Sequence, residues 1–146
     1  MKGIVLAAGK GTRLYPMTKP VCKPLLPVYD KPLIYYPIAT LLQAGIKDIL
    51  VIIPPGEEKE FTNLLGDGSE FGIHIEFAVQ KVARGIADAL IIGEDFIGDD
   101  SVCLVLGDNI FHCHNLDEIM KEAIKDDHGA KVFGYYVDCL LYTSPS

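Results

Sequence analysis

The sequence lacks long apolar runs, an excess of positive charge and a regular cysteine framework. No run approaches the about 18 apolar residues of a membrane-spanning helix, so we expect no membrane association. The formal net charge is -7 at pH 7, which argues against nucleic acid as a partner. The four cysteines have unrelated spacings, and the first residues lack the apolar core and cleavage site of a secretory leader, so the cytoplasm is the expected compartment.

The composition is that of an ordinary packed domain, with 49% hydrophobic and 23% charged residues. Short apolar runs bounded by glycine, proline or aspartate predict strands that are buried on both faces of a parallel sheet. Such runs occupy residues 4–8, 49–53 and 102–106. Alternating or β-branched patterns predict two further strands, at residues 73–79 and 131–137.

Segments of helical length separate these strands. They are expected at residues 32–44, 57–65, 84–92 and 116–125. In the first of them, Asp30 is a candidate N-cap and Pro37 is expected to kink the helix. The alternation predicts an α/β fold with a Rossmann-like, mostly parallel sheet and helices on both faces. The loops after Ala8, Val79 and Leu106 should then share one crevice at the carboxyl ends of the strands.

The turn LAAGKGTRLYP at residues 6–16 has the features of an anion-binding loop. Gly9 and Gly11 leave backbone N–H groups open to a phosphate, and the Arg13 guanidinium can grip two phosphate oxygens. The polar side chains of the turn are Lys10, Thr12 and Arg13. The spacing is not that of a Walker A loop, and Leu14 stands where a Rossmann fingerprint has its third glycine. Taken alone, the turn fits solvated charges on a glycine loop equally well.

Four further residues are candidates for ligand binding. Lys23 lies in a stiff, proline-rich path that can aim its ammonium group, although a solvated lysine is the simpler interpretation. Gln80 offers a donor and an acceptor to a nucleobase edge, and Gly85 permits close backbone approach. Asp108 follows a buried strand, where it can hold Mg²⁺ or close an Asx turn. The His-Cys-His segment at 112–114 matches no structural zinc spacing.

Taken together, these segments resemble the sugar-1-phosphate nucleotidyltransferases, a family with a GT-A-like fold. The resemblance extends from residue 1 to about residue 137. It rests on GIVLAAGKGTRLYP at 3–16, Lys23 before LLPVYDKPLIYYP at 25–37, LLGDGS at 64–69, Gln80, Gly85, and LVLGDN at 104–109.

The resemblance implies transfer of a deoxythymidylyl group from dTTP to glucose 1-phosphate, giving dTDP-glucose and pyrophosphate for sugar-nucleotide synthesis of the dTDP-rhamnose type. UTP is the alternative donor, because Pro24 after the lysine is frequent in uridylyl- and guanylyltransferases. It also implies that Mg²⁺ is bound by Asp108, and that the full-length form is a homo-oligomer. The implied catalytic residues are Arg13, Lys23 and Asp108. The implied nucleotide-binding residues are Leu6, Ala8, Gly9, Gly11, Thr12, Arg13, Lys23, Gln80, Gly85, Asp108 and Asn109.

The last residues depart from the family pattern. Residues 139–146 match no part of it and have the composition of a non-native tail joined to a truncated reading frame. Residues 1–138 are therefore expected to be the N-terminal, nucleotide-binding part of the transferase domain. We expect this chain alone to be marginally stable and inactive, and a non-catalytic nucleotide-binding fragment is the alternative of another class.

Overall fold

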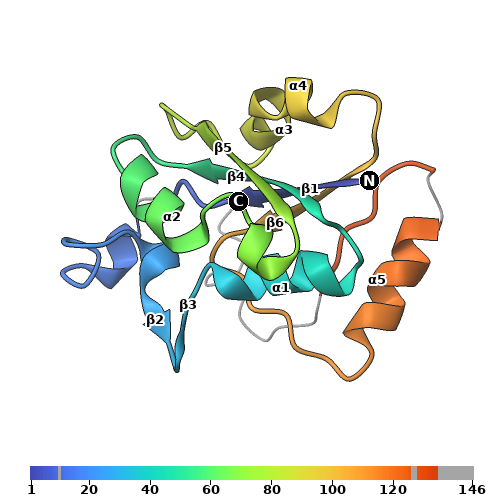
Figure 1. The fold of residues 1–146 in the computed structure, drawn as a ribbon, viewed down its shortest axis with the longest axis horizontal. Coiled ribbons are helices and arrows are strands. Elements are labelled where there is room, and N and C mark those ends of the chain that lie inside the picture. Colours follow the sequence, from blue (N-terminus) through green and yellow to red (C-terminus); the bar gives the residue numbers. More distant parts are fainter. Residues whose placement is uncertain (10, 126–127, 135–146) are drawn as a thin grey trace.

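A four-stranded parallel sheet with the strand order β5-β4-β1-β6 organises the chain (Figure 1). The structure is a computed structural model, and it describes residues 1–9, 11–125 and 128–134. The four strands are β1 (Lys2–Leu6), β4 (Asp48–Ile53), β5 (His74–Val79) and β6 (Val102–Leu106). Their positions confirm four of the five expected strands. The expected α/β class is likewise confirmed.

The apolar runs of the strands are continuous because successive side chains enter two different cores. On β1, Val5 packs into one hydrophobic cluster while its neighbour Ile4 packs into the other. The same alternation occurs on β4, where Ile49 and Leu50 enter opposite clusters. A strand with apolar neighbours on both faces needs no polar alternation.

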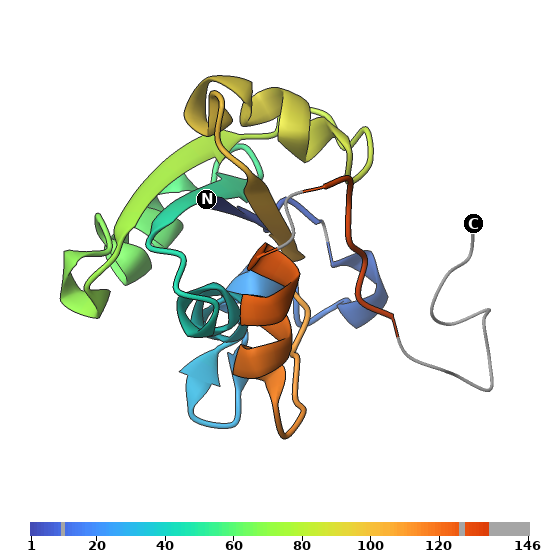
Figure 2. The same cartoon turned by 90° about the vertical axis from the view of Figure 1, so that its right-hand side faces the viewer.

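Helices cover both faces of this sheet (Figure 2). One face carries α1 (Tyr35–Gln43), α2 (Glu58–Leu65) and α5 (Leu116–Lys125), and the other carries α3 (Asp88–Ile92) and α4 (Glu94–Ile97). Short 3₁₀ helices span Thr12–Leu14, Lys23–Leu25 and Ser69–Phe71. Among the described residues, no helix is long and apolar enough to cross a membrane.

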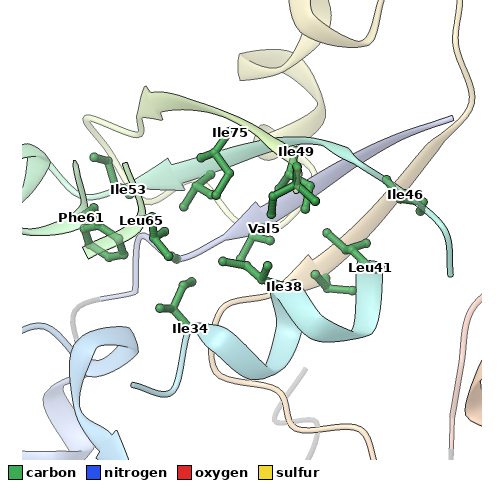
Figure 3. Packing of buried hydrophobic residues seen from close by; sticks show 14 of the residues in the cluster. Val5, Ile34, Ile38, Leu41, Ile46, Ile49, Ile53, Phe61, Leu65 and Ile75 are labelled. Carbon is green, nitrogen blue, oxygen red and sulfur yellow. The ribbon is translucent and has the colours of Figure 1, made fainter. Parts of the chain in front are cut away.

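The larger core lies between the sheet and α1 (Figure 3). Ile34, Ile38 and Leu41 face Val5 and Ile49 across this layer. Burying an aliphatic side chain of this size stabilises a fold by about 1.5–3 kcal/mol. The layer therefore holds β1 and β4 in place, and with them the loops that follow these strands.

The helix expected at residues 32–44 starts later than its pattern indicates. The preceding residues form a small antiparallel hairpin of β2 (Pro27–Val28) and β3 (Lys31–Pro32). Consequently Ile34, and not Asp30, occupies the N-cap position of α1. Pro37 is the third residue of α1, where a backbone N–H has no intrahelical acceptor, so the expected kink is wrong: the proline removes no hydrogen bond.

The helix expected at residues 84–92 is also shorter than predicted. Only α3 from Asp88 onward is helical, because Gly85 has φ of 102°, which is incompatible with a right-handed helix. The helices expected at 57–65 and 116–125 are confirmed as α2 and α5.

The fifth expected strand is not formed over the residues that can be compared. Residues 131–134 form no strand, and the other residues of the prediction, 135–137, lie outside the described part of the chain. The physical reason is that a strand needs a hydrogen-bonded neighbour, whereas no described strand pairs with this segment and Val132 is 94% exposed. Lys10 and the expected non-native tail at 139–146 also lie outside the described residues.

Candidate active site

The carboxyl ends of the four strands lie at one edge of the sheet, as the arrows in Figure 1 show. The ladder extends one residue beyond three of these strands. Ala7 N donates to Ile52 O at 2.8 Å, and Gln80 N donates to Ile53 O at 2.9 Å. Gly107 N donates to Leu6 O at 2.8 Å. The loops after β1, β5 and β6 therefore start at the same edge of the sheet. Those after β1 and β6 are adjacent, and β4 lies between β1 and β5.

The loop after β1 requires glycine at position 11. Gly11 has φ of 58°, and a Cβ atom there would lie 2.8 Å from Thr18 Cγ2 and 3.0 Å from Lys23 Cβ. Thr18 Oγ1 also donates a hydrogen bond to Gly11 O at 3.0 Å. The glycine thus allows the loop to close against the segment that carries Lys23. Sequence patterns gave no signal for this role of Thr18.

Lys23 and Asp108 form an ion pair across this edge, with 2.6 Å between Lys23 Nζ and Asp108 Oδ2. The two residues are 85 positions apart in the sequence. Their side chains are 32% and 39% exposed, so a ligand can reach both of them. The structure thereby brings together a cation suited to phosphate and a carboxylate suited to a metal ion.

The position of Asp108 depends on the glycine before it. A Cβ atom at Gly107 would lie 2.9 Å from Ala7 Cα, so the loops after β1 and β6 touch at this point. Asn109 N then donates to Leu106 O at 3.1 Å and closes a turn. The carboxylate of Asp108 is held at the strand end by this turn, while Asn109 is exposed.

The other candidates on the β1 loop are placed beside this pair without joining it. Thr12 and Arg13 are exposed on the 3₁₀ helix Thr12–Leu14, and Arg13 forms no ion pair with any described residue. Gly9 is exposed, whereas Ala8 is buried. Leu6 uses its carbonyl oxygen in the bond to Gly107. Among the described residues of this loop, the Arg13 guanidinium, Thr12 and the backbone at Gly9 are thus open to a ligand.

Gln80 is buried at the same edge and is bound to a residue that sequence patterns did not single out. Its Nε2 donates to Asp88 Oδ2 at 2.9 Å, and Asp88 Oδ1 lies 2.9 Å from Arg84 Nη2. In a helix over 84–92, Asp88 is an ordinary helical position, so the expected helix gives no sign of this contact. Gly85 is exposed, and no heavy atom lies within 4 Å of a Cβ atom built on it.

The donor set fits a magnesium ion that is held partly by its substrate. Within residues 1–9, 11–125 and 128–134, no group of three or more His, Cys, Asp or Glu side chains could form a metal cage. Mg²⁺ is usually bound by one or two carboxylates, with phosphate oxygens and water as its other ligands. The accessible carboxylate of Asp108 suits such an ion, for which Lys23 is a competitor.

Comparison with known proteins identifies the family of the chain. The nucleotidyl transferase family matches residues 2–139, and the chain belongs to this family.

Its relatives include glucose-1-phosphate thymidylyltransferases. That of Neisseria meningitidis serogroup A is 60% identical over 137 residues, which are 94% of this chain and 48% of the relative. That of Xanthomonas campestris is 56% identical over 94% of this chain and 46% of the relative. The chain thus spans about half the length of these curated relatives.

Solved structures agree with the fold. A Bacillus anthracis structure described as a glucose-1-phosphate thymidylyltransferase with sucrose matches with a TM-score of 0.82 and 43% identity, over 88% of this chain and 52% of that chain. A UDP-glucose pyrophosphorylase complexed with UDP-glucose matches with a TM-score of 0.68 and 26% identity, over 85% and 53% of the two chains.

Proposed function

We propose that this chain is the nucleotide-binding part of a glucose-1-phosphate thymidylyltransferase, which makes dTDP-glucose and pyrophosphate from dTTP and glucose 1-phosphate. The observation that carries the proposal is the Lys23–Asp108 pair at 2.6 Å, beside the glycine loop after β1. The 60% identity to a thymidylyltransferase supports dTTP as the donor. We further propose the cytoplasm as its compartment and a homo-oligomer as the full-length form.

The reaction needs alignment and charge neutralisation more than it needs a protein nucleophile. A phosphate oxygen of glucose 1-phosphate bonds to the α-phosphorus of dTTP. The bond from that phosphorus to the oxygen bridging the β-phosphate breaks, and pyrophosphate leaves with the electron pair. Because the attacking oxygen is already ionised at neutral pH, no Ser-His or Cys-His arrangement is required. The barrier falls chiefly through orientation and electrostatic stabilisation.

Each proposed group has a place in this scheme. The backbone of the loop at residues 8–13 cradles the triphosphate, and the Arg13 guanidinium, which is exposed and unpaired among the described residues, grips its oxygens. Lys23 neutralises charge that develops on the phosphates. Gln80 and the open backbone at Gly85 read the base.

Asp108 would hold Mg²⁺, with Asn109 beside it to position phosphate groups. When bound, the ion neutralises phosphate charge and orients the phosphates. Lys23 Nζ lies 2.6 Å from Asp108 Oδ2, so this cation competes with Mg²⁺ for the carboxylate, and a nucleotide phosphate would offer the lysine another partner.

The experiment is equilibrium binding of dTTP and of UTP to the chain in the presence of Mg²⁺. Binding is the first readout because it does not depend on the parts of the relatives that the chain does not span. We expect dTTP to bind and D108N to weaken binding at least about tenfold, the loss of one charge-assisted contact. D48N is the matched control: Asp48 is exposed at the amino end of β4, the opposite edge of the sheet.

The outcomes separate the candidate functions. Tighter binding of UTP than of dTTP would point to the uridylyl alternative. Pyrophosphate release with glucose 1-phosphate, measured on the chain and on the full reading frame of its source, separates a transferase from a domain that only binds nucleotide. If neither nucleotide binds at millimolar concentration, or if D108N and D48N behave alike, the proposed function is wrong.

A further inference from the structure

Two of the three buried polar residues in the described part of the chain are bonded to each other beside the candidate site. Gln80 is 6% exposed and Asp88 is 5% exposed. The third, Thr40, only bonds to the backbone of its own helix. Burying an amide and a carboxylate costs free energy unless the groups are paired, and here Asp88 is paired with both Gln80 and Arg84.

The chemistry of the pair allows only one orientation of the Gln80 amide. A carboxylate can only accept hydrogen bonds, so the Gln80 NH₂ group must face Asp88, as the 2.9 Å contact from Nε2 to Oδ2 shows. The reverse orientation would set Gln80 Oε1 against a carboxylate oxygen. The Arg84 guanidinium, 2.9 Å from the other Asp88 oxygen, pairs with the charged carboxylate.

This orientation leaves a defined set of groups for a ligand. One N–H of the Gln80 amide is used by Asp88, and the other N–H and Oε1 remain. No group in the described part of the chain donates a hydrogen bond to Oε1. The amide therefore keeps one acceptor, Oε1, and one donor N–H for a ligand.

We propose that Asp88 is a positioning residue that determines base specificity by fixing the Gln80 amide. With Oε1 as the acceptor, the site selects bases that carry an N–H next to a carbonyl, which thymine and uracil do at N3. Cytosine has an acceptor at N3, so its N3 lone pair would face the lone pairs of Gln80 Oε1 and no hydrogen bond would form. The inference rests on the proposed function, in which Gln80 reads the base, and it names the groups that exclude cytosine.

Asp88→Asn tests this assignment with an isosteric change. An asparagine can donate to Gln80 Oε1, so the amide can turn over and present its NH₂ to cytosine N3. We expect D88N to reduce the ratio of dTTP to dCTP affinity by about tenfold, through weaker dTTP binding and stronger dCTP binding. D67N is the control, because the Asp67 carboxylate also accepts a hydrogen bond, from Ser69 N, but lies before β5 and not after it.

The measurement is calorimetric binding of dTTP, UTP and dCTP with Mg²⁺ to the folded chain and both variants. An equal loss of affinity for all three nucleotides in D88N would show a merely structural role and overturn the assignment. An unchanged ratio of dTTP to dCTP would also overturn it. Failure of the unmodified chain to bind any nucleotide would instead refute the proposed function, and the inference with it.

A second arm needs no substitution, so it holds even if D88N does not fold. The probe is 3-methyl-dTTP, in which a methyl group replaces the N3 hydrogen. We expect the unmodified chain to bind it at least tenfold more weakly than dTTP, because Oε1 then has no donor to accept from. Equal affinity for the two nucleotides would contradict the orientation of Gln80 toward N3.

Discussion

Replacing Gly107 by alanine tests how closely the two loops of the candidate site approach. A Cβ atom at position 107 would lie 2.9 Å from both Cα and Cβ of Ala7 and 3.1 Å from Leu6 O. These neighbours are backbone atoms and a methyl group, so none can rotate away. Ordinary contact begins at 3.4 Å, and the difference from 2.9 Å means that the loops must separate by about 0.5 Å.

The cost follows from two opposing effects. Forcing an extra methyl group into a packed site costs about 1–3 kcal/mol. Replacing glycine by alanine also restricts the unfolded chain, which stabilises the fold by about 0.4–1 kcal/mol. Gly9→Ala is the matched control, because no heavy atom lies within 4 Å of a Cβ built there and its φ is not positive. The two variants share the second effect, so G107A should be less stable than G9A by about 1–3 kcal/mol.

The assay is urea unfolding of the chain, followed by circular dichroism, with the slope of the transition checked for constancy. G107A and the unmodified chain are then compared for Mg²⁺-dependent dTTP binding, which G107A should weaken because the shift displaces Asp108 from Lys23. A difference in unfolding free energy of less than about 0.5 kcal/mol between G107A and G9A would refute the close packing of the two loops.

Two further predictions concern charges and thiols. Lys23→Met should raise the affinity of the chain for Mg²⁺ by about two- to fivefold, because it removes the cation on Asp108. The same substitution should weaken Mg²⁺-dependent dTTP binding. Calorimetric titration measures both affinities, and weaker Mg²⁺ binding would contradict the prediction. Burial, aided by the Glu57 carboxylate, raises the pKa of the Cys22 thiol to about 11. Since the thiolate is the reactive form, Cys22 should stay unlabelled by a thiol reagent at pH 8 in the folded chain and should gain reactivity only toward pH 11. The exposed Cys113 should react at pH 8. Mass spectrometry of labelled peptides compares the two rates, and equal rates at pH 8 would contradict the prediction.

The main elements of the fold could be predicted from local patterns. The apolar run at 102–106 and the amphipathic segment at 116–125 coincide with β6 and α5 residue for residue. Local patterns failed where a longer-range requirement prevails. Residues 131–134 have strand composition but no strand partner among the described elements.

The candidate site was predictable in its residue types but not in its contacts. Lys23 and Asp108 each fit a simple structural interpretation on their own, and the 2.6 Å contact between them supports the proposal that they act together at one site. Asp88 carried no signal, because its importance depends on Gln80, and the two meet only after the loop at Gly85 turns back. A sequence pattern cannot predict a hydrogen bond between two side chains when the backbone between them is irregular.

The sequence by itself determined the order of strands and helices, because apolar spacing and glycine positions act over a few residues. It also placed polar side chains after the strands, where a parallel sheet exposes them. The tertiary structure decided which of these side chains meet. The order β5-β4-β1-β6 puts the loop after β6 against the loop after β1, and so puts Asp108 on Lys23. That order is set by packing of the two cores over the whole chain, which is a long-range free energy that no local pattern contains.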